Sequence, residues 1–463
     1  MSAITYDTIK VVGVPYSKLL SLEIIHFPNQ HGTAKMTGLI PYADAMEFTQ
    51  RVDETFAIDI TTSAEGQPSQ LFYGLVTNLV HERQNDYAFV TIEAKTTSVS
   101  LDVAPANKTY QRTTMTYGQV LSKMIGGRGT ITVTATDKQT GAFIIQCNET
   151  DWQFTIRMAS ALKSPACASI TAKKPFIYIG PPPASKSRTI TAVEYDTGKE
   201  VSEFSRFSAV AGGGAMSSDF GGDVVTSFDY AYIGDSISLN GSTLYVRGVQ
   251  AYLQDGTLVC KYTIGRKSSF AAAPIANTQA AGKIMTGIVQ NVEMDKVQVF
   301  FNSIDSSYDG GGDWWFPYST SYSSQDGSGW YSMPAAGDEV RVFFPSGNEG
   351  EAFAACSIQI NPGERVTDKI WSGPNGKKIL LTEDGLMIIG KEAKLFINLM
   401  DLTGIEIISD KNITITSACN VNIQAGDTVN VLAENHILLG TQASYVDIRN
   451  EGITMSSENI ILT

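Results

Sequence analysis

Several signals that would place this 463-residue chain in a familiar class are missing from it. No apolar run reaches the ~18 residues that a membrane-spanning helix needs. The start, MSAITYDTIK, has neither a basic stretch nor an apolar segment, so we predict no signal peptide. The cysteines Cys147, Cys167, Cys260, Cys356 and Cys419 are odd in number and form no CxxC. This pattern predicts free thiols in a protein assembled in a reducing compartment.

Charge is also scarce, because charged residues make up 17% of the chain against an average of about 25%. The net charge of −13 excludes nucleic acid as a main partner, since phosphate binding needs a basic surface. Long helical patterns rich in Leu, Glu and Lys are rare, whereas Tyr, Thr, Ser, Gly and Val are frequent. The predicted fold class is therefore mainly β.

Catalytic and cofactor motifs are absent as well. The histidines His26, His31, His81 and His436 form no HExxH or HxH, and the chain has no GxSxG. The glycine-rich stretch 209–223 lacks the Lys-Ser/Thr of a phosphate-binding loop, so we interpret it as an ordinary loop. No pair of carboxylates stands out as a glycosidase dyad. We predict no enzyme, no cofactor and no metal.

The clearest positive signal is a series of apolar pairs at positions i and i+2 in the C-terminal part. Most pairs begin eight residues after the last, with one ten-residue step before Ile405. Such alternation predicts short strands with one inward face, and each octad then holds a strand and a bend. Downstream, Tyr445 and Asp447 form a weak pair, and Val446 with Ile448 suggests a slip. The predicted core positions are Ile379, Leu381, Met387, Ile389, Leu395, Ile397, Ile405, Ile407, Ile413, Ile415, Val421, Ile423, Val429, Val431, Ile437 and Leu439.

One ribbon of such strands is too thin to bury its own apolar face, and its edges would be open. A single chain can solve this by coiling into a three-sided β-helix. Alternatively, three chains can wind into a triangular prism, the solution that we favour because one coil would leave two exposed ends. An ordinary β-meander is the third alternative.

The middle of the chain predicts a small barrel. Strands are expected at Gly282–Val289 and Val297–Phe301, around a turn at Met294, and later strands at Trp315 and at Val340 to Phe344. Glycine-rich spans, including 309–313, read as loops. About five short strands in fewer than a hundred residues suit a Greek-key barrel such as an OB-fold. Its many aromatic residues suit packing against neighbouring subunits, with glycan binding as the alternative.

The N-terminal region predicts a large mixed β structure with a few helices. Residues 56–96 suggest three strands with turns at Glu65-Gly66 and Asn85-Asp86, and a further hairpin turn is expected at Asp255-Gly256. The sequence TYGQVLSKMIGG predicts a helix ended by its two glycines. A second helix follows Thr150, which with Gln153 forms a capping-box pattern.

Three segments resemble the VgrG-type hub-and-spike proteins of contractile injection systems, which include phage tails, R-type bacteriocins and type VI secretion. The segment CNETDWQFTIRMAS is similar to a helix motif of the family. The segment around Met333, Pro334 and Gly337-Asp338-Glu339-Val340 is similar to its OB-domain motif. The octads are similar to its β-helix. The matching residues of the helix motif are Glu149, Asp151, Trp152, Phe154 and Arg157.

The resemblance implies three domains. Residues 1–270 would form a hub with two barrel-like subdomains and helices, so that three chains present six similar units to a hexameric tail tube. Residues 271–366 would form an OB-fold domain, and 367–463 a triple-stranded β-helix needle formed by a trimer. The 361–377 connection is too short to hold a lysozyme domain, and no HxH motif suggests an iron-binding tip.

The implied function is structural: a homotrimeric central spike that links the tail tube to a membrane-piercing tip. Expected partners are two further copies of the chain, tail-tube and baseplate proteins at the hub, a small PAAR-like cap at the C-terminal end, and transiently the target envelope. Assembly is expected in the bacterial cytoplasm, within a particle that is released or membrane-anchored. The alternatives are a polysaccharide or peptidoglycan hydrolase on a β-helix, and a receptor-binding tail fibre.

Overall fold

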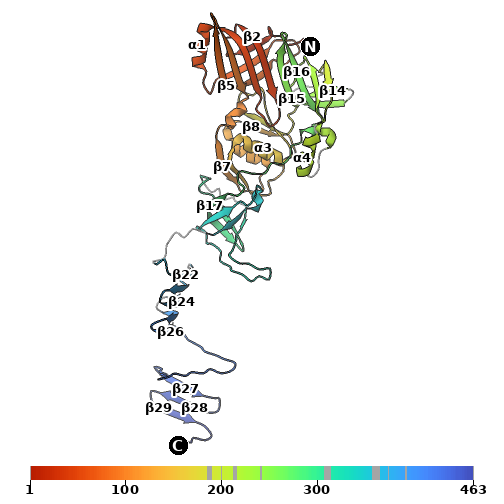
Figure 1. Cartoon of the computed structure of the whole chain (residues 1–463). Helices are drawn as coiled ribbons and strands as arrows, with labels where there is room; N and C mark the ends of the chain where they lie inside the picture. Colours follow the sequence, from red (N-terminus) through yellow and green to blue (C-terminus); the bar gives the residue numbers. More distant parts are fainter. Residues whose placement is uncertain are drawn as a thin grey trace. The chain divides into compact units, whose positions relative to one another are not determined.

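The computed structural model describes residues 2–184, 190–199, 201–211, 216–239, 242–306, 314–356, 365–373, 375–391 and 394–461. Over these ranges the chain is mainly β, with a few helices, as the sequence predicts (Figure 1). No described helix has the length and apolar character to cross a membrane. The chain divides into two compact units, Met1–Ile358 and Gln359–Thr463.

One sheet of 11 strands dominates the first unit, in the order β1-β4-β5-β6-β3-β2-β15-β16-β13-β12 with β14 on β15. Its two halves meet where β2 pairs antiparallel with β15. One continuous sheet therefore occupies most of the region for which the resemblance implies two barrel-like subdomains. The strands are β1 Ile9–Val12, β2 Lys18–His26, β3 Thr33–Pro41, β4 Ala57–Thr62, β5 Gln70–Gln84, β6 Tyr87–Lys95, β12 Glu194–Asp196, β13 Asp223–Ser227, β14 Ser236–Leu239, β15 Ser242–Gln254 and β16 Thr257–Gly265.

The turns between these strands follow the sequence. The β5–β6 hairpin turns at Asn85, with φ 55°, and the β15–β16 hairpin turns at Asp255 and Gly256, with φ 50° and 79°. Glycine and Asn/Asp tolerate such left-handed values best, so local sequence sets these hairpins. The glycine-rich span 309–313 lies outside the described residues.

A smaller layer, called here the helical layer, contains residues 97–180. It consists of α2 Tyr117–Ile125, α3 Asp151–Ala161, the paired strands β7 Pro105–Tyr110 and β9 Ile144–Thr150, and the sheet β10 Ala166–Ala168, β11 Phe176–Ile179 and β8 Thr130–Val133, joined by the 3-10 turns η1 Thr97–Leu101 and η2 Gly126–Arg128. Both predicted helices form, and both carry capping boxes, at Thr116 and Thr150. Each cap stabilises its helix by about 1 kcal/mol.

Two further helices were not predicted from the sequence. Helix α1 (Tyr42–Arg51) begins at Pro41 without a side-chain cap and buries only Ala45 and Phe48. Helix α4 (Val201–Ala211) and the 3-10 turn η3 (Ser217–Phe220) meet in a small cluster of phenylalanines. Neither helix starts with a capping pattern that the sequence would reveal.

The OB-fold prediction is confirmed by strand order. The strands β17 Ile284–Glu293, β18 Lys296–Phe300, β19 Phe316–Pro317, β20 Glu339–Phe343 and β21 Phe353–Ala355 pair in the order β19-β18-β17-β20-β21. A parallel bridge between Tyr318 and Ala354 then joins the third strand to the fifth. These pairings are the ones that close a five-stranded Greek-key barrel. The turn at Met294, with φ 49°, lies where predicted.

The OB barrel and the helical layer share a hydrophobic core. Phe143, Ile145 and Cys147, from β9 and the residue before it, are buried among Val297, Phe301 and other side chains of the barrel. The hub and the barrel therefore form one compact unit, although the sequence suggests a boundary near residue 270.

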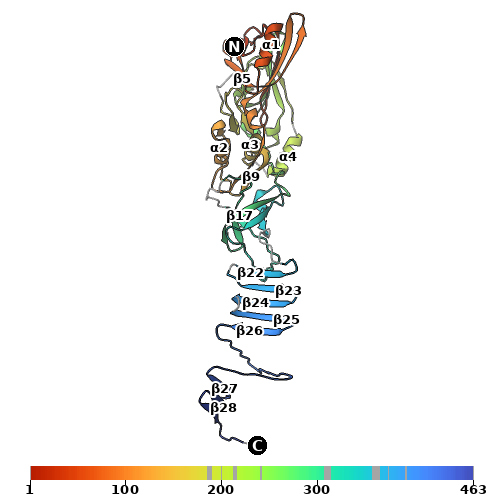
Figure 2. The ribbon, with the colours of Figure 1, turned by 90° about the vertical axis from the view of Figure 1, so that its left-hand side faces the viewer.

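The second unit contains two antiparallel meanders. The first joins β22 Lys369–Ser372, β23 Lys378–Thr382, β24 Gly385–Lys391, β25 Leu395–Met400 and β26 Gly404–Ser409, which lie side by side in chain order (Figure 2). The second joins β27 His436–Gly440, β28 Tyr445–Arg449 and β29 Gly452–Ser456. Adjacent strands pair antiparallel, so the single chain does not coil into a three-sided β-helix here.

Residues 410–435 form no strand in the single chain, although the octads predict strands at Ile413, Val421 and Val429. The octads predict these strands for a β-helix assembled from three chains, and for that assembly they stay a prediction. A strand needs a neighbour that satisfies its backbone N–H and C=O groups, and the described part of the chain supplies no neighbour here.

Candidate functional site

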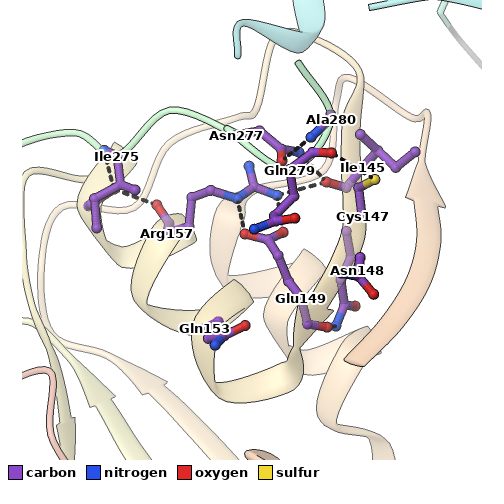
Figure 3. Close-up of polar contacts among 12 residues, drawn as sticks. Ile145, Cys147, Asn148, Glu149, Gln153, Arg157, Ile275, Asn277, Gln279 and Ala280 are labelled. Carbon is purple, nitrogen blue, oxygen red and sulfur yellow. Dashed lines mark hydrogen bonds and ion pairs between the residues drawn. The ribbon is translucent and has the colours of Figure 1, made fainter. Parts of the chain in front are cut away.

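A buried arginine, Arg157, lies where the helical layer meets the OB barrel (Figure 3). Helix α3 carries it, and only 4% of the side chain is exposed. Its Nε and Nη2 atoms donate to the two carboxylate oxygens of Glu149, both at 2.7 Å. Its Nη1 donates to Glu349 at 2.7 Å, and Nη2 also donates to the carbonyl of Ile145 at 2.7 Å. One guanidinium thereby joins α3, β9 and the 3-10 turn η5 (Glu349–Glu351) of the barrel.

The segment that connects the hub to the barrel is tied into the same network. Asn277 is 1% exposed, and its Nδ2 donates to Ile145 O and to Glu349 Oε1, both at 2.9 Å. Its Oδ1 accepts from the backbone N–H of Ala280 at 3.1 Å. We call Glu149, Arg157, Asn277 and Glu349 the arginine joint.

The arginine joint keeps its charge. Burial alone lowers the pKa of Arg157, but the hydrogen bonds that it donates to Glu149 and the negative charge of Glu349 raise that pKa above its ordinary value. A bidentate, fully hydrogen-bonded pair of this kind is geometrically strict, so the joint fixes the orientation of three elements at once. We expect the joint to act mechanically, by resisting displacement of the barrel relative to α3.

The sequence identified half of the joint. Glu149 and Arg157 belong to the helix motif, whereas Asn277 and Glu349 were missed. Glu349 lies 192 residues from Arg157 along the chain, and nothing in its local sequence distinguishes it from a surface carboxylate.

The predicted trimer-core residues lie on the C-terminal meanders and on the segment between them. Directly paired residues of an antiparallel sheet point to the same face. In the first meander this places an apolar set on one face, called face A: Ile379, Leu381, Leu386, Ile388, Leu395, Ile397, Leu399, Ile405 and Ile407. Lys378, Thr382, Asn398 and Glu406 lie among apolar residues on the opposite face.

Two of the residues predicted for the trimer core lie off face A in the single chain. Met387 pairs with Leu380, and Ile389 pairs with Lys378, so both point away from face A. The reason is the two-residue turn between β23 and β24. This turn pairs odd-numbered residues of β23 with even-numbered residues of β24, so the apolar face carries even positions in β24. Leu386 and Ile388 take their places.

The second meander repeats this arrangement. Ile437 pairs with Ile448, and Leu439 pairs with Val446. Ile453 and Met455 complete the same face. The suggested slip at Val446 and Ile448 is thus present in the register, and the weak pair Tyr445/Asp447 points the other way.

These apolar residues are uncovered in the single chain. Exposed fractions are 50% for Leu381, 73% for Ile405 and 63% for Ile453. The residues between the meanders are equally bare: Ile413 57%, Ile415 74%, Val421 53%, Ile423 76%, Val429 51% and Val431 58%. So many exposed apolar side chains in one unit are typical of an interface and are otherwise an aggregation hazard.

The register gives a direct test of face A. We expect Ile388→Asp to prevent association of the C-terminal unit, because Ile388 shares face A with eight other apolar side chains. Met387→Asp, one residue away on the opposite face, should be tolerated far better. Size-exclusion chromatography with light scattering measures both, and association lost only in Met387→Asp would contradict the face assignment.

The fold also brings together a serine, a histidine and an aspartate that the sequence did not connect. His31 Nδ1 lies 2.8 Å from Ser98 Oγ, and His31 Nε2 lies 3.3 Å from Asp102 Oδ2. Ser98 is 1% exposed, however, and its hydroxyl also contacts Thr96 Oγ1 at 2.9 Å. A nucleophile must reach its substrate, so we interpret the cluster as structural. Among the described residues, no group of three or more His, Cys, Asp or Glu side chains could hold a metal.

Comparison with known proteins relates this architecture to contractile injection systems. No protein-family model and no curated sequence matches the chain. Among solved structures, one match is the E. coli c3393 protein, described as a component of the type VI secretion system with structural similarity to the T4 bacteriophage tail proteins gp27 and gp5. That match has a TM-score of 0.54 at 14% identity and covers 75% of this chain and 98% of that chain. A chain of the half-lidded Francisella PdpA-VgrG complex matches with a TM-score of 0.53 at 9% identity, covering 84% and 83%.

The chain thus shares its fold with the c3393 protein and with the matched chain of the PdpA-VgrG complex. The resemblance seen in the sequence is confirmed at the level of the fold. Within this fold, the arginine joint lies between the helical layer and the OB barrel, and the uncovered apolar residues lie in the C-terminal unit.

Proposed function

We propose that the chain is the structural hub and needle of a contractile injection particle and that three copies form the spike. The observation that carries this proposal is the uncovered apolar surface of the C-terminal unit, in a chain with a VgrG-type fold. Two more copies supply what one chain lacks: cover for face A and strand partners for residues 410–435. In this proposal the hub meets the tail tube and baseplate proteins, and the needle crosses the target envelope first.

The arginine joint supports a mechanical role. A spike driven through an envelope must carry load from the hub to the needle without bending between its parts. A buried, bidentate arginine with carboxylates on two elements resists such bending better than an apolar contact, because its geometry is directional.

The C-terminal end supports a capping partner. Ile460 and Ile461 are 55% and 82% exposed, and the last strand, β29, has one free edge in the described chain. We expect a small PAAR-like protein to cover this end, since open edges and bare apolar groups promote aggregation. An image reconstruction of the intact particle tests this, and a tip with Ile461 bare to solvent would contradict it.

The hydrolase alternative makes a different prediction. We expect the purified protein to release no soluble product from peptidoglycan or from bacterial polysaccharides, because its sequence carries no catalytic motif and the serine next to His31, Ser98, is 1% exposed. Turnover that a single Asp or Glu substitution abolishes would favour the hydrolase over the structural spike.

A further inference from the structure

The connection between β2 and β3 is held tightly against the helical layer. The backbone N–H of Asn29 donates to Ala166 O at 2.7 Å, and Asn29 Oδ1 accepts from the N–H of Ala166 at 2.8 Å. The N–H of Thr96 donates to Gly32 O at 2.8 Å. A Cβ at Gly32 would lie 2.9 Å from a methyl group of Thr96, so the contact leaves no spare room. We call this contact, residues 26–32 against 96–102 and 166–170, the seam.

Two of the four histidines of the chain lie in the seam. His26 is 3% exposed, and its Nε2 lies 2.8 Å from the carbonyl of Ala168. Since a carbonyl only accepts, Nε2 carries the proton, and the buried Nδ1 is an acceptor without a partner. His31 lies between Ser98 and Asp102, with its ring 4.4 Å from the ring of Trp152 in α3.

The surroundings of His26 do not favour its cationic form. Protonation would place a second N–H on the buried Nδ1, which has no partner, and His26 also lines a cavity of about 140 Å³ together with Tyr178, Tyr232 and Asp235. The Asp235 carboxylate already accepts from the backbone N–H of Tyr232 at 3.0 Å. Burial lowers the pKa of His26 to about 4, and the hydrogen bond to Ala168 offsets this only in part.

The groups around His31 shift its pKa in opposite directions. Burial lowers the pKa of His31; the hydrogen bond and the charge of Asp102 act in the opposite direction, and the positive charge of Lys95 adds to the lowering. A histidine whose pKa is lowered in the folded protein binds a proton more readily once the histidine has left the seam. The contribution of the two histidines to the stability of the closed seam is therefore complete when the pH lies above 6.5, the ordinary pKa of histidine. This contribution is lost as the pH falls below that value.

We propose that the seam is an acid-sensitive latch: it holds the β2–β3 connection against the helical layer at neutral pH, and protonation of His26 and His31 on release opens it in acid. The helical layer also carries the arginine joint, through α3 and β9. An open latch thus frees the large sheet from the elements that the joint fixes, without breaking the joint itself.

Hydrogen exchange of the full-length protein tests the latch. The N–H groups of Asn29, Thr96 and Ala166 cross the seam, and their protection reports its opening. Between pH 6 and pH 5 we expect the opening constant, after correction for intrinsic exchange, to rise by up to about tenfold for each of the two histidines. In the variant His26→Gln/His31→Gln this rise should largely disappear.

A matched control is His81→Gln, since His81 lies on β5 outside the seam and its Nδ1 contacts Thr49 Oγ1. This variant should behave as the wild type. If the double variant does not fold, His31→Gln alone provides the test by the same exchange measurement, and about half of the rise should then disappear. The latch is refuted if the seam stays protected through pH 4, or if acid opens wild type and variant alike.

Discussion

Val421→Asp is expected to abolish the proposed trimer. In a single chain Val421 is 53% exposed, so a carboxylate there costs an isolated chain almost nothing. In a three-fold assembly the octad brings three copies of position 421 close to one axis. Three buried carboxylates without partners each cost several kcal/mol to desolvate, and they repel one another. Loss of a trimer band resistant to SDS without boiling is the expected readout.

The neighbouring change Asn420→Asp is the matched control. It adds the same charge one residue away, on the face that the alternation turns to solvent, where substitutions usually change stability by less than about 0.5 kcal/mol. If both variants stay trimeric, or if Asn420→Asp is the damaging one, the inward assignment of Val421 is wrong. Positions 420 and 421 are both exposed in the single chain. A difference in trimer stability between the two variants therefore requires an interface that buries Val421 and leaves Asn420 in solvent.

Arg157→Met is expected to destabilise the first unit by about 3–5 kcal/mol, because it leaves two carboxylates buried without their cation. Glu149 and Glu349 have 9% and 14% of their side chains exposed, so water compensates them poorly. Urea unfolding of the full-length protein, followed by tryptophan fluorescence, measures the loss. The hub should separate from the barrel at a lower urea concentration than in the wild type.

The control for Arg157→Met is Lys35→Met, which removes an ion pair of similar length. Lys35 Nζ lies 2.8 Å from Glu93, but 58% of the lysine side chain and 42% of the glutamate side chain are exposed. Exposed pairs contribute less than about 1 kcal/mol. An equal loss in both variants would mean that the arginine joint is no stronger than a surface contact.

Local sequence patterns predicted the parts of the fold that local physics determines. The capping boxes at Thr116 and Thr150 start α2 and α3, and the turn at Asp255-Gly256 joins β15 to β16. The octad also predicted which face of β23, β25 and β26 is apolar. At β24 the single chain turns Leu386 and Ile388 to that face in place of Met387 and Ile389, because strand parity depends on turn length and a two-residue turn reverses it.

The candidate sites were only partly predictable for a different reason. The partnership of Arg157 with Glu349, and that of His31 with Ser98 and Asp102, joins residues that are far apart in sequence. Arg157 belongs to the helix motif, but nothing in the local sequence of Glu349, Ser98 or Asp102 indicates a partner. Only tertiary packing brings these residues together. The apolar octads, in contrast, can be recognised in the sequence because they repeat over short distances.

The mass of the native, full-length protein tests the central claim most directly. Native mass spectrometry of the purified chain at neutral pH should give three times the mass of one chain, because face A and residues 410–435 need partners that one copy cannot supply. A folded protein with the mass of a single chain would contradict the spike, since its apolar surface would then be stable in water without cover.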